Sequence, residues 1–404
     1  MALHDIVVAA SYDPAYSLGK VREDHSKELD RTGIGNHYLS RFDSGLTKFD
    51  APVDGVPIIG RVLLNVLRAQ RFHHAPVVGG QSVKDVLDTF SEVWADDIHR
   101  FGLDLQFVHE GDQQDWGVTN TAARGDAYIT MRTGKAHDYF WFLCPDAPFG
   151  TLHSVKPGSH DHDVSLNLNT KEAIYNGLES FPRRWNYAVR TAQGVRHGKE
   201  DHCFLMRATP QVLAAADKVF EARKSCRKAG ALKTLIKEEA VKKHPLRSAY
   251  ALLRYDRPAI KQALRLDWKQ PLSEELVSAL MSIASGADIS VRLAQGHLGL
   301  HMDCDSLEDL VYHNVLAQNP KAYPYNEDIE RFKEEAMPRL IERNPAFATI
   351  HEEIDDFADK VGAKRLFCDG RIRDNILLDY PQFTPAMFDE SARLLEEYNK
   401  RQKF

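Results

Sequence analysis

Apolar positions recur with helical spacing in some stretches of the chain and with strand spacing in others. From Ser82 to Phe90 the apolar residues stand three or four positions apart, which predicts an amphipathic helix. The runs Ala127–Met131 and Tyr139–Leu143 are rich in aromatic and β-branched residues, which favours strands. The first 200 residues are therefore expected to mix helices with short strands.

The pattern changes in the second half of the chain. Residues 208–285 are rich in Ala, Lys, Leu and Glu, and this composition predicts helices. Before this block we expect a helix at about 170–180 and a strand at Phe204–Met206. After it, Asp288–Leu293 and His297–Met302 predict a pair of strands joined by a glycine turn.

Composition narrows the function classes. Apolar residues make up 43% of the 404 residues and charged residues 27%, as in ordinary globular proteins. A net charge of −6 gives no sign of a general nucleic-acid or membrane-surface binder. There is no apolar run long enough for a membrane span and no signal-peptide pattern. The five cysteines are scattered without a CxxC pair, so we expect a cytoplasmic protein.

An arginine beside two spaced glycines is the first candidate for ligand binding. In Asp30–Gly35, Arg31 offers a fixed cation, and the glycines let a ligand approach the backbone closely. This arrangement suits an anion such as a phosphate. Glycine pairs also mark ordinary turns, so the motif has a second reading as a plain turn.

Two adjacent arginines form the second candidate. Arg183 and Arg184 directly follow the helix expected at 170–180, and such a pair can clamp a phosphate with parallel hydrogen bonds. The alternative is that both arginines are solvated on the surface.

A cysteine next to a histidine forms the third candidate. Cys203 follows His202, and a neighbouring histidine and nearby cations can favour the nucleophilic thiolate. The alternative is a buried cysteine that packs as a small apolar residue at the start of a strand.

The fourth candidate lies after the predicted strand His297–Met302. That strand leads to Ser306, Asp309 and Asn314 at one end of a sheet, and an amide can both donate to and accept from the edge of a pyrimidine ring. The alternative is a helix capped by Asp305 or Ser306.

Taken together, these motifs resemble thymidylate synthase and the related phage-type pyrimidine nucleotide hydroxymethylases. Asp30–Gly35 is similar to the phosphate loop of that family, Val56–Ile59 to the strand that follows it, and Thr89–Asp97 to a tryptophan-containing segment. Arg183–Arg184 and Cys203 then follow in the family order.

The resemblance implies an α+β fold, namely a thymidylate-synthase-like mixed β-sheet with flanking helices and two insertions. The chain would divide into an N-terminal core part (1–100), a β-rich insertion (101–168), a core segment (169–207), a helical insertion (208–286), a core strand pair with a helix (287–324) and a C-terminal helical region (325–404).

The resemblance also implies an activity. The substrate would be a pyrimidine nucleoside monophosphate, modified at carbon 5 by hydroxymethylation in preference to methylation, with methylenetetrahydrofolate as the one-carbon donor. The family's paired arginines reach across a two-fold interface, which implies a homodimer. The resemblance assigns Cys203 as the nucleophile, Arg31, Arg183, Arg184 and Ser306 to the phosphate, Asp309 and Asn314 to the pyrimidine, and Trp94 to the cofactor.

The chain departs from the family pattern at two positions that matter for catalysis. Asp305 stands where the family has a phosphate-binding arginine, and the region of the catalytic glutamate reads His73-His74. Because histidine titrates near neutral pH, His73 or His74 could serve as the acid–base group. The alternative is a catalytically altered relative that acts as a nucleotide-binding or assembly module.

The segment 159–163 offers a possible metal site. His160 and His162 alternate with Asp161 and Asp163, and such ligands suit zinc or iron. The alternative, a solvated polar loop, is the commoner fate of such a segment, and we assign no metal.

Overall fold

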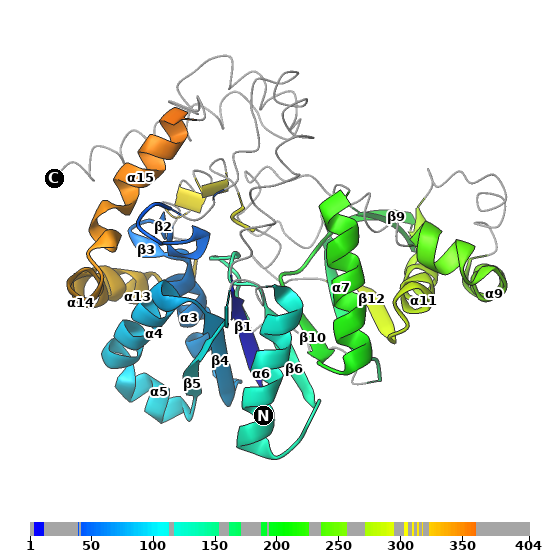
Figure 1. Cartoon of the computed structure of the whole chain (residues 1–404), viewed down its shortest axis with the longest axis horizontal. Coiled ribbons are helices and arrows are strands. Elements are labelled where there is room, and N and C mark those ends of the chain that lie inside the picture. The colour runs from blue at the N-terminus through cyan, green and yellow to red at the C-terminus, as the bar shows by residue number, and fades with distance from the viewer. Residues whose placement is uncertain are drawn as a thin grey trace.

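A computed structural model of the chain provides the structure (Figure 1). It describes residues 4–11, 39, 42–112, 117–152, 161–170, 187–191, 194–225, 236–256, 271–294, 303–305, 309–310, 313–314, 317 and 323–360.

Four parallel strands form one half of a large sheet. They are β1 (Ile6–Ala10), β4 (His74–Gly79), β5 (Asp104–His109) and β6 (Tyr139–Leu143), in the spatial order β6-β1-β4-β5. Three of them are almost continuously apolar, as expected for strands covered on both faces. The chain thus runs outward from β1 through β4 to β5 and then returns to the other side of β1.

Antiparallel pairing extends the sheet beyond β6. Strand β10 (Cys203–Arg207) pairs antiparallel with β6 and with β7, so it joins the two halves. The outer half is completed by β7 (Val164–Thr170), β9 (Gly194–Glu200), β8 (Tyr187–Thr191), the short β11 (Leu272–Ser273), and β12 (Ile289–Ala294), which runs parallel to β7.

Helices cover both faces of the sheet because side chains along β1 alternate between two apolar cores. Ile6 and Val8 face the first core, and Val7 and Ala9 face the second. The first core is covered by α3 (Ile58–Ala69), α4 (Gln81–Val93) and α5 (Ala95–Phe101). The second is covered by α6 (Val118–Thr133), α7 (Pro210–Ser225), the π-helical turn η4 (Ile236–Lys242), α9 (Pro245–Tyr255) and α11 (Glu274–Ser285).

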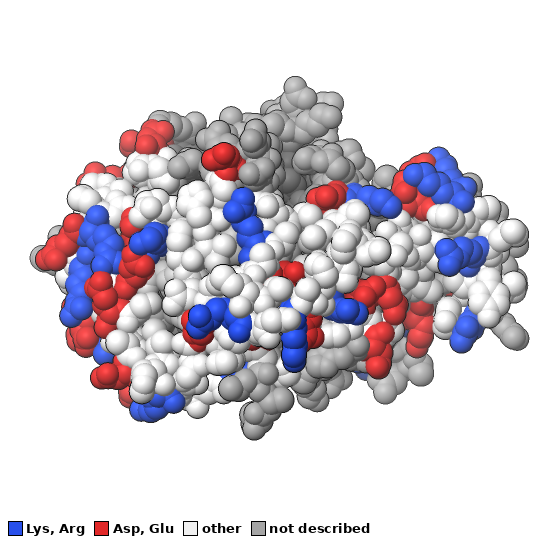
Figure 2. Space-filling view, turned by 60° about the horizontal axis from the view of Figure 1, so that its bottom comes forward, with Lys and Arg blue, Asp and Glu red and all other residues white. Residues whose placement is uncertain are grey.

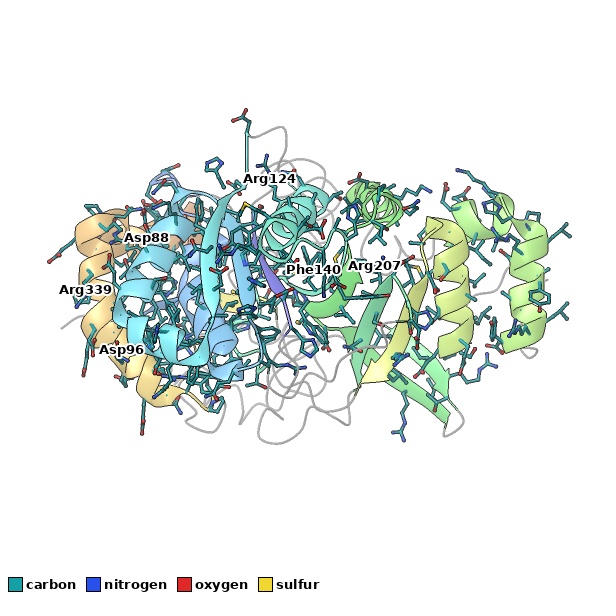
Figure 3. The ribbon with its side chains drawn as sticks, turned by 90° about the horizontal axis from the view of Figure 1, so that it is seen from below. Asp88, Asp96, Arg124, Phe140, Arg207 and Arg339 are labelled. Atoms are coloured by element: carbon teal, nitrogen blue, oxygen red, sulfur yellow. The ribbon has the colours of Figure 1, made fainter. Side chains whose placement is uncertain are left out.

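A C-terminal group of helices packs against α3 and α4 on the first face (Figure 1). Arg68 on α3 forms a bidentate pair with Asp328, and Arg343 reaches Glu92 on α4. Figure 3 shows Asp88, Asp96 and Arg339 at this end of the molecule and Arg207 in the other half of the sheet. The group consists of α13 (Asn326–Arg331), η6 (Phe332–Ala336), α14 (Met337–Arg343) and α15 (Ala346–Lys360).

Small elements connect β1 to the first helix. The 3-10 turn η1 (Lys48–Asp50) precedes the two-residue strands β2 (Pro52–Val53) and β3 (Val56–Pro57), and α3 begins directly at Ile58. The segment Val56–Ile59 was expected to be a strand. Only its first two residues form one, and its last two begin α3.

The fold differs from the one expected from sequence. The prediction of a thymidylate-synthase-like fold was wrong, because β1, β4, β5 and β6 form a doubly wound parallel half of the sheet with helices on both faces. Strands β5 and β6, placed in a β-rich insertion, pair directly with β4 and β1: β6 lies inside the sheet and β5 forms its edge.

Local predictions had a mixed outcome. The helix at Ser82–Phe90 and the strands at Tyr139–Leu143, Phe204–Met206 and Asp288–Leu293 are confirmed. The strand at Ala127–Met131 was wrong, since these residues lie in α6. The helix at 170–180 and the strand His297–Met302 fall outside the described residues. Among the residues that the structure describes, no helix is long and apolar enough to cross a membrane.

Candidate functional site

The strand order defines a switch point at β1. The connection after β1 leads to β4 on one side, and the later strand β6 lies on the other side. In open parallel sheets, the crevice outside the carboxyl ends of the strands at such a point is the usual ligand site. The residues that follow β6 at this edge are Cys144, Pro145 and Asp146.

Asp146 lies beside His202 because of the register between β6 and β10. Cys203 pairs with Leu143, and the Cys144 amide donates to the carbonyl of His202 over 2.7 Å. The His202 Nδ1 then lies 2.7 Å from Oδ1 of Asp146. The two antiparallel strand ends therefore place a carboxylate and an imidazole in contact at the switch-point edge.

Lys48 brings a second cation to the same carboxylate. Its Nζ donates to Oδ2 of Asp146 over 3.0 Å and to Oδ1 of Asp305 over 2.6 Å. Asp303, two residues earlier, has its Oδ2 3.7 Å from the His202 Nε2. We call Lys48, Asp146, His202, Asp303 and Asp305 the charged cluster.

The charged cluster is mostly buried, with its outer side toward the surface. The side chains of His202 and Asp303 are only 10% and 4% exposed, whereas that of Asp305 is 25% exposed. Within the described part of the chain, the buried His202 Nε2 has no hydrogen-bond partner. A buried donor without an acceptor is costly, and the Asp303 carboxylate at 3.7 Å compensates this atom only in part, so it can still donate to a ligand oxygen or a water.

Opposite charges shift the titration of every central member of the cluster. Burial alone would lower the pKa of His202, but Asp146 and Asp303 together raise it to about 10. Burial alone would raise the pKa of Asp146, and Lys48 and His202 outweigh this and hold it well below its usual range. Burial likewise opposes the charge of Lys48, whose pKa is nevertheless raised by Asp146 and Asp305. At neutral pH the cluster therefore holds two cations between carboxylates.

A second polar cluster lies next to the first, at the amino end of α4. The turn η1 carries Lys48 to Asp146 and also carries Asp50, whose Oδ2 accepts from the Ser82 hydroxyl over 2.7 Å and from the Thr47 amide over 2.7 Å. Asp50 is fully buried, and this burial raises its pKa to about 6 despite the hydrogen bonds from Ser82 and Thr47. The turn η1 thus links the carboxyl ends of β6 and β4.

Cys203 lies near the charged cluster but is enclosed in the core. It is completely buried, and burial together with Asp201 raises the pKa of its thiol well above the ordinary value. A thiol in these surroundings stays protonated, which does not favour the nucleophilic thiolate. The packing corresponds to the alternative of a cysteine that serves as a small core residue.

His73 and His74 lie at the opposite edge of the sheet. His74 begins β4, and its Nδ1 lies 2.8 Å from Oδ1 of Asp5, just before β1. The amino ends of the parallel strands meet at this edge, so the two histidines do not converge with Cys203 or Asp146.

The other described candidates are engaged in packing. Trp94 is buried and stacks on Phe90, with ring centroids 4.6 Å apart. The Asn314 amide accepts from the Asp54 amide and donates to the carbonyls of Pro52 and Leu310.

Asp309 lies closest to the charged cluster among the residues proposed to read the base. Its Oδ2 accepts from the Asp305 amide over 3.1 Å. The phosphate candidates Arg31, Arg183, Arg184 and Ser306 lie outside the described residues, so the convergence expected of them stays a prediction.

The described part of the alternating His and Asp segment forms an ion pair rather than a metal site. His162 Nδ1 lies 3.1 Å from Oδ2 of Asp288, and Asp163 accepts from the Asp288 amide. Over the described residues as a whole, no three His, Cys, Asp or Glu side chains form a group that could hold a metal ion.

Sequence reasoning missed most of the charged cluster. Lys48, Asp146 and Asp303 were not among the candidates. Asp146 did carry a signal, since an acidic residue three positions after a buried strand of a parallel sheet lies at the ligand-binding edge. Lys48 carried none, because its partners lie 98 and 257 positions along the chain.

No protein-family model and no curated protein matches this sequence. Solved structures match in part. They include 4-diphosphocytidyl-2C-methyl-D-erythritol synthase from Anaerococcus prevotii (8% identity, TM-score 0.35, 79% of this chain and 99% of that chain). The inositol-1-phosphate CTP transferase from T. maritima matches with 13% identity and a TM-score of 0.33 over 83% of this chain and 98% of that chain.

A third match is UDP-glucose pyrophosphorylase from Acinetobacter baumanii, with 10% identity and a TM-score of 0.35 over 81% of this chain and 98% of that chain. TM-scores this low assign the chain to none of these families. These three proteins are nucleotidyltransferases, and none of them is a thymidylate synthase.

The observed fold and the packing of Cys203 correct the functional expectation. The prediction of a folate-dependent methyl- or hydroxymethyltransferase of the thymidylate synthase family, and with it the nucleotide-binding relative of that family, was wrong. The doubly wound sheet is a different scaffold, and the proposed cysteine nucleophile is a buried, protonated thiol.

Proposed function

We propose that the chain is an enzyme that binds a phosphate-bearing metabolite, of the nucleotide class, at the carboxyl edge of β1 and β6 and transfers a phosphorus-linked group from it. The observation that carries the proposal is the position of the charged cluster. Its central carboxylate, Asp146, directly follows β6 at the point where the strand order reverses.

Two donors in the cluster can take an added phosphate oxygen, although its three carboxylates outnumber its two cations. Lys48 uses two of its three N–H donors on Asp146 and Asp305, and the His202 Nε2 makes no hydrogen bond within the described structure. Each cation therefore keeps one donor for an added ligand oxygen. Charge-assisted bonds from an ammonium and an imidazolium are strong when they are partly desolvated.

The carboxylates of the cluster orient the two cations and keep them charged. Asp146 holds the His202 ring by its Nδ1, so that Nε2 points away from Asp146, as in other acid–base sites where a carboxylate orients an imidazole. Because His202 stays charged at neutral pH, its role is to stabilise negative charge that develops on phosphate oxygens. Lys48 would do the same from the turn η1.

The direct test is binding of nucleotides to the full chain. Nucleoside mono-, di- and triphosphates and inorganic phosphate would be titrated in turn, with the heat of binding and the melting temperature as readouts. We expect at least one nucleotide to bind, and Lys48→Met and His202→Gln to weaken that binding by about tenfold or more. Release of phosphate or pyrophosphate reports the transfer reaction.

Matched variants separate charge loss from misfolding. Lys48→Arg keeps the charge and should retain most of the binding, whereas Lys84→Met removes a surface lysine paired with Asp88 and should change nothing. Nucleotide binding that is equal in Lys48→Met and the unaltered chain would contradict the proposal, and so would a folded chain that no nucleotide stabilises.

A further inference from the structure

Helix α9 presents an apolar surface at the end of the molecule farthest from the C-terminal helices (Figure 1). Leu246, Tyr250 and Leu253 are 85%, 61% and 55% exposed, and they follow one another at spacings of four and three. This spacing places them in one stripe along the helix. Single exposed apolar residues are common, but a stripe of three large ones on one helix marks an interaction surface.

The stripe borders an open groove between α9 and α11. The groove has a volume of about 450 Å³. Its floor is formed by small or half-buried side chains of both helices, and its walls include two tyrosines. Its lining residues are Leu246, Arg247, Tyr250, Ala251, Tyr255, Ala279 and Ile283. A groove between two neighbouring helices is a site into which a third helix can pack.

The arginines beside the groove make no salt bridge within the described structure, although the Arg254 guanidinium lies over the Tyr255 ring, 5.1 Å from its centroid. The lysines of the preceding η4 turn are each neutralised, since Lys242 pairs with Glu238 and Lys243 with Glu239. In contrast, Arg247 and Arg254 are exposed and, within the described structure, neither makes a salt bridge or a hydrogen bond. At this end of the molecule, Figure 2 shows Lys and Arg side chains, some of them beside acidic ones, in surface that is otherwise uncharged.

From this pattern we infer that the α9–α11 groove is a docking site for an acidic amphipathic helix of a partner protein. The apolar stripe of the partner would cover Leu246 and Tyr250, and its carboxylates would pair with Arg247 and Arg254. Tyrosine and arginine are the residues that most often dominate such interfaces.

The same charges argue against a second copy of this chain in the groove. A two-fold interface built on α9 would bring Arg247 and Arg254 of both copies together, and like charges at an interface are repelled. An extended peptide is also disfavoured, since helices offer no unpaired backbone edge for strand addition. An acidic helix satisfies both the apolar stripe and the arginines.

The test uses the full chain and a designed probe. The probe is a fluorescein-labelled helical peptide of about 16 residues, long enough to span α9, with leucines at helical spacing and flanking glutamates. A second peptide carries lysine in place of every glutamate, and a third has the acidic sequence scrambled. Fluorescence anisotropy measures the Kd of each.

We expect the acidic peptide to bind and the other two to bind roughly tenfold more weakly or not at all. Arg247→Glu with Arg254→Glu should reverse the preference between the acidic and the lysine peptide. Tyr250→Ser should weaken the binding of the acidic peptide by about tenfold. Met131→Ser is the control, because Met131 is 70% exposed on α6, away from the groove, and its loss should leave the Kd unchanged.

Three results would overturn the inference. The first is an acidic peptide that binds no better than its scrambled form. The second is a Kd that does not respond to the arginine reversals in variants shown by circular dichroism to be folded. The third is binding of the chain to vesicles of anionic phospholipid that is lost in Tyr250→Ser, which would make the stripe a membrane contact.

Discussion

The His202 Nδ1 lies 2.7 Å from Oδ1 of Asp146, although the two residues are 56 positions apart in the chain. The contact follows from strand pairing, since β10 begins one residue after His202 and β6 ends three residues before Asp146. The carboxylate also accepts from Lys48. Removal of Asp146 therefore leaves two buried cations without the carboxylate that they share.

Asp146→Asn should be strongly destabilising. It leaves the buried cations Lys48 and His202 without their shared carboxylate, and loss of one partner from a buried pair costs about 3–5 kcal/mol. Urea unfolding followed by circular dichroism measures the free energy of unfolding. Asp305→Asn is the control, because this more exposed carboxylate should contribute about 1 kcal/mol or less. Equal losses in the two variants would show that Asp146 is not the centre of the cluster.

Stability should fall as the pH rises from about 6.5 to about 10. The pKa of His202 is about 6.5 in the unfolded chain and about 10 in the folded one, so the fold holds this proton more tightly. Its contribution is complete below pH 6.5 and is lost as the pH approaches 10. The effect is on the order of a few kcal/mol.

The pH series identifies the residue responsible. Urea unfolding at a series of pH values should show this slope in the unaltered chain and in His99→Gln, which changes an exposed histidine on α5. The slope should be much smaller in His202→Gln. An unaltered slope in His202→Gln would assign it to another group.

The extent to which the sequence predicted the fold depends on how local each signal was. Helix α4 and strand β6 were predicted because their apolar residues follow one period without interruption. Helix α6 was misread at Ala127–Met131, because much of its buried face consists of small or polar residues, including Thr121, Ala122 and Gly125. A face of this kind shows little periodicity when only large apolar residues are considered.

The candidate site was less predictable than the fold because its contacts are non-local. Lys48, Asp146 and Asp303 become neighbours only through the strand order and the turn η1, and no short motif contains two of them. In the sequence analysis, His202 was considered only as a neighbour of Cys203, and the catalytic role was assigned to the cysteine. Strand alternation gives the opposite assignment, with Cys203 buried in the core and His202 at the sheet edge.

A second pH dependence should appear between about pH 4 and pH 6. Burial raises the pKa of Asp50 from 3.8 to about 6, so the folded chain favours the protonated carboxyl. Its contribution to stability is therefore largest below pH 3.8 and is lost as the pH rises to about 6. Asp50→Asn, which is neutral throughout, should reduce this decline, as measured by urea unfolding at each pH. Asp96→Asn on the exposed side of α5 is the control, and the Asp50 assignment fails if both variants have the same profile.

Close packing of α6 on β1 should make Gly125 intolerant of a side chain. A Cβ at this position would overlap the Cγ2 of Val7, so either the helix or the strand would have to move. Overpacking of this kind costs about 1–3 kcal/mol, and we expect Gly125→Ala to lower the free energy of unfolding by that amount. Val7→Ala removes the two methyl groups in the way, so the same substitution should cost much less in that background. If Gly125→Ala is equally costly with Val7 and with alanine at position 7, the contact between α6 and β1 is not what selects glycine there.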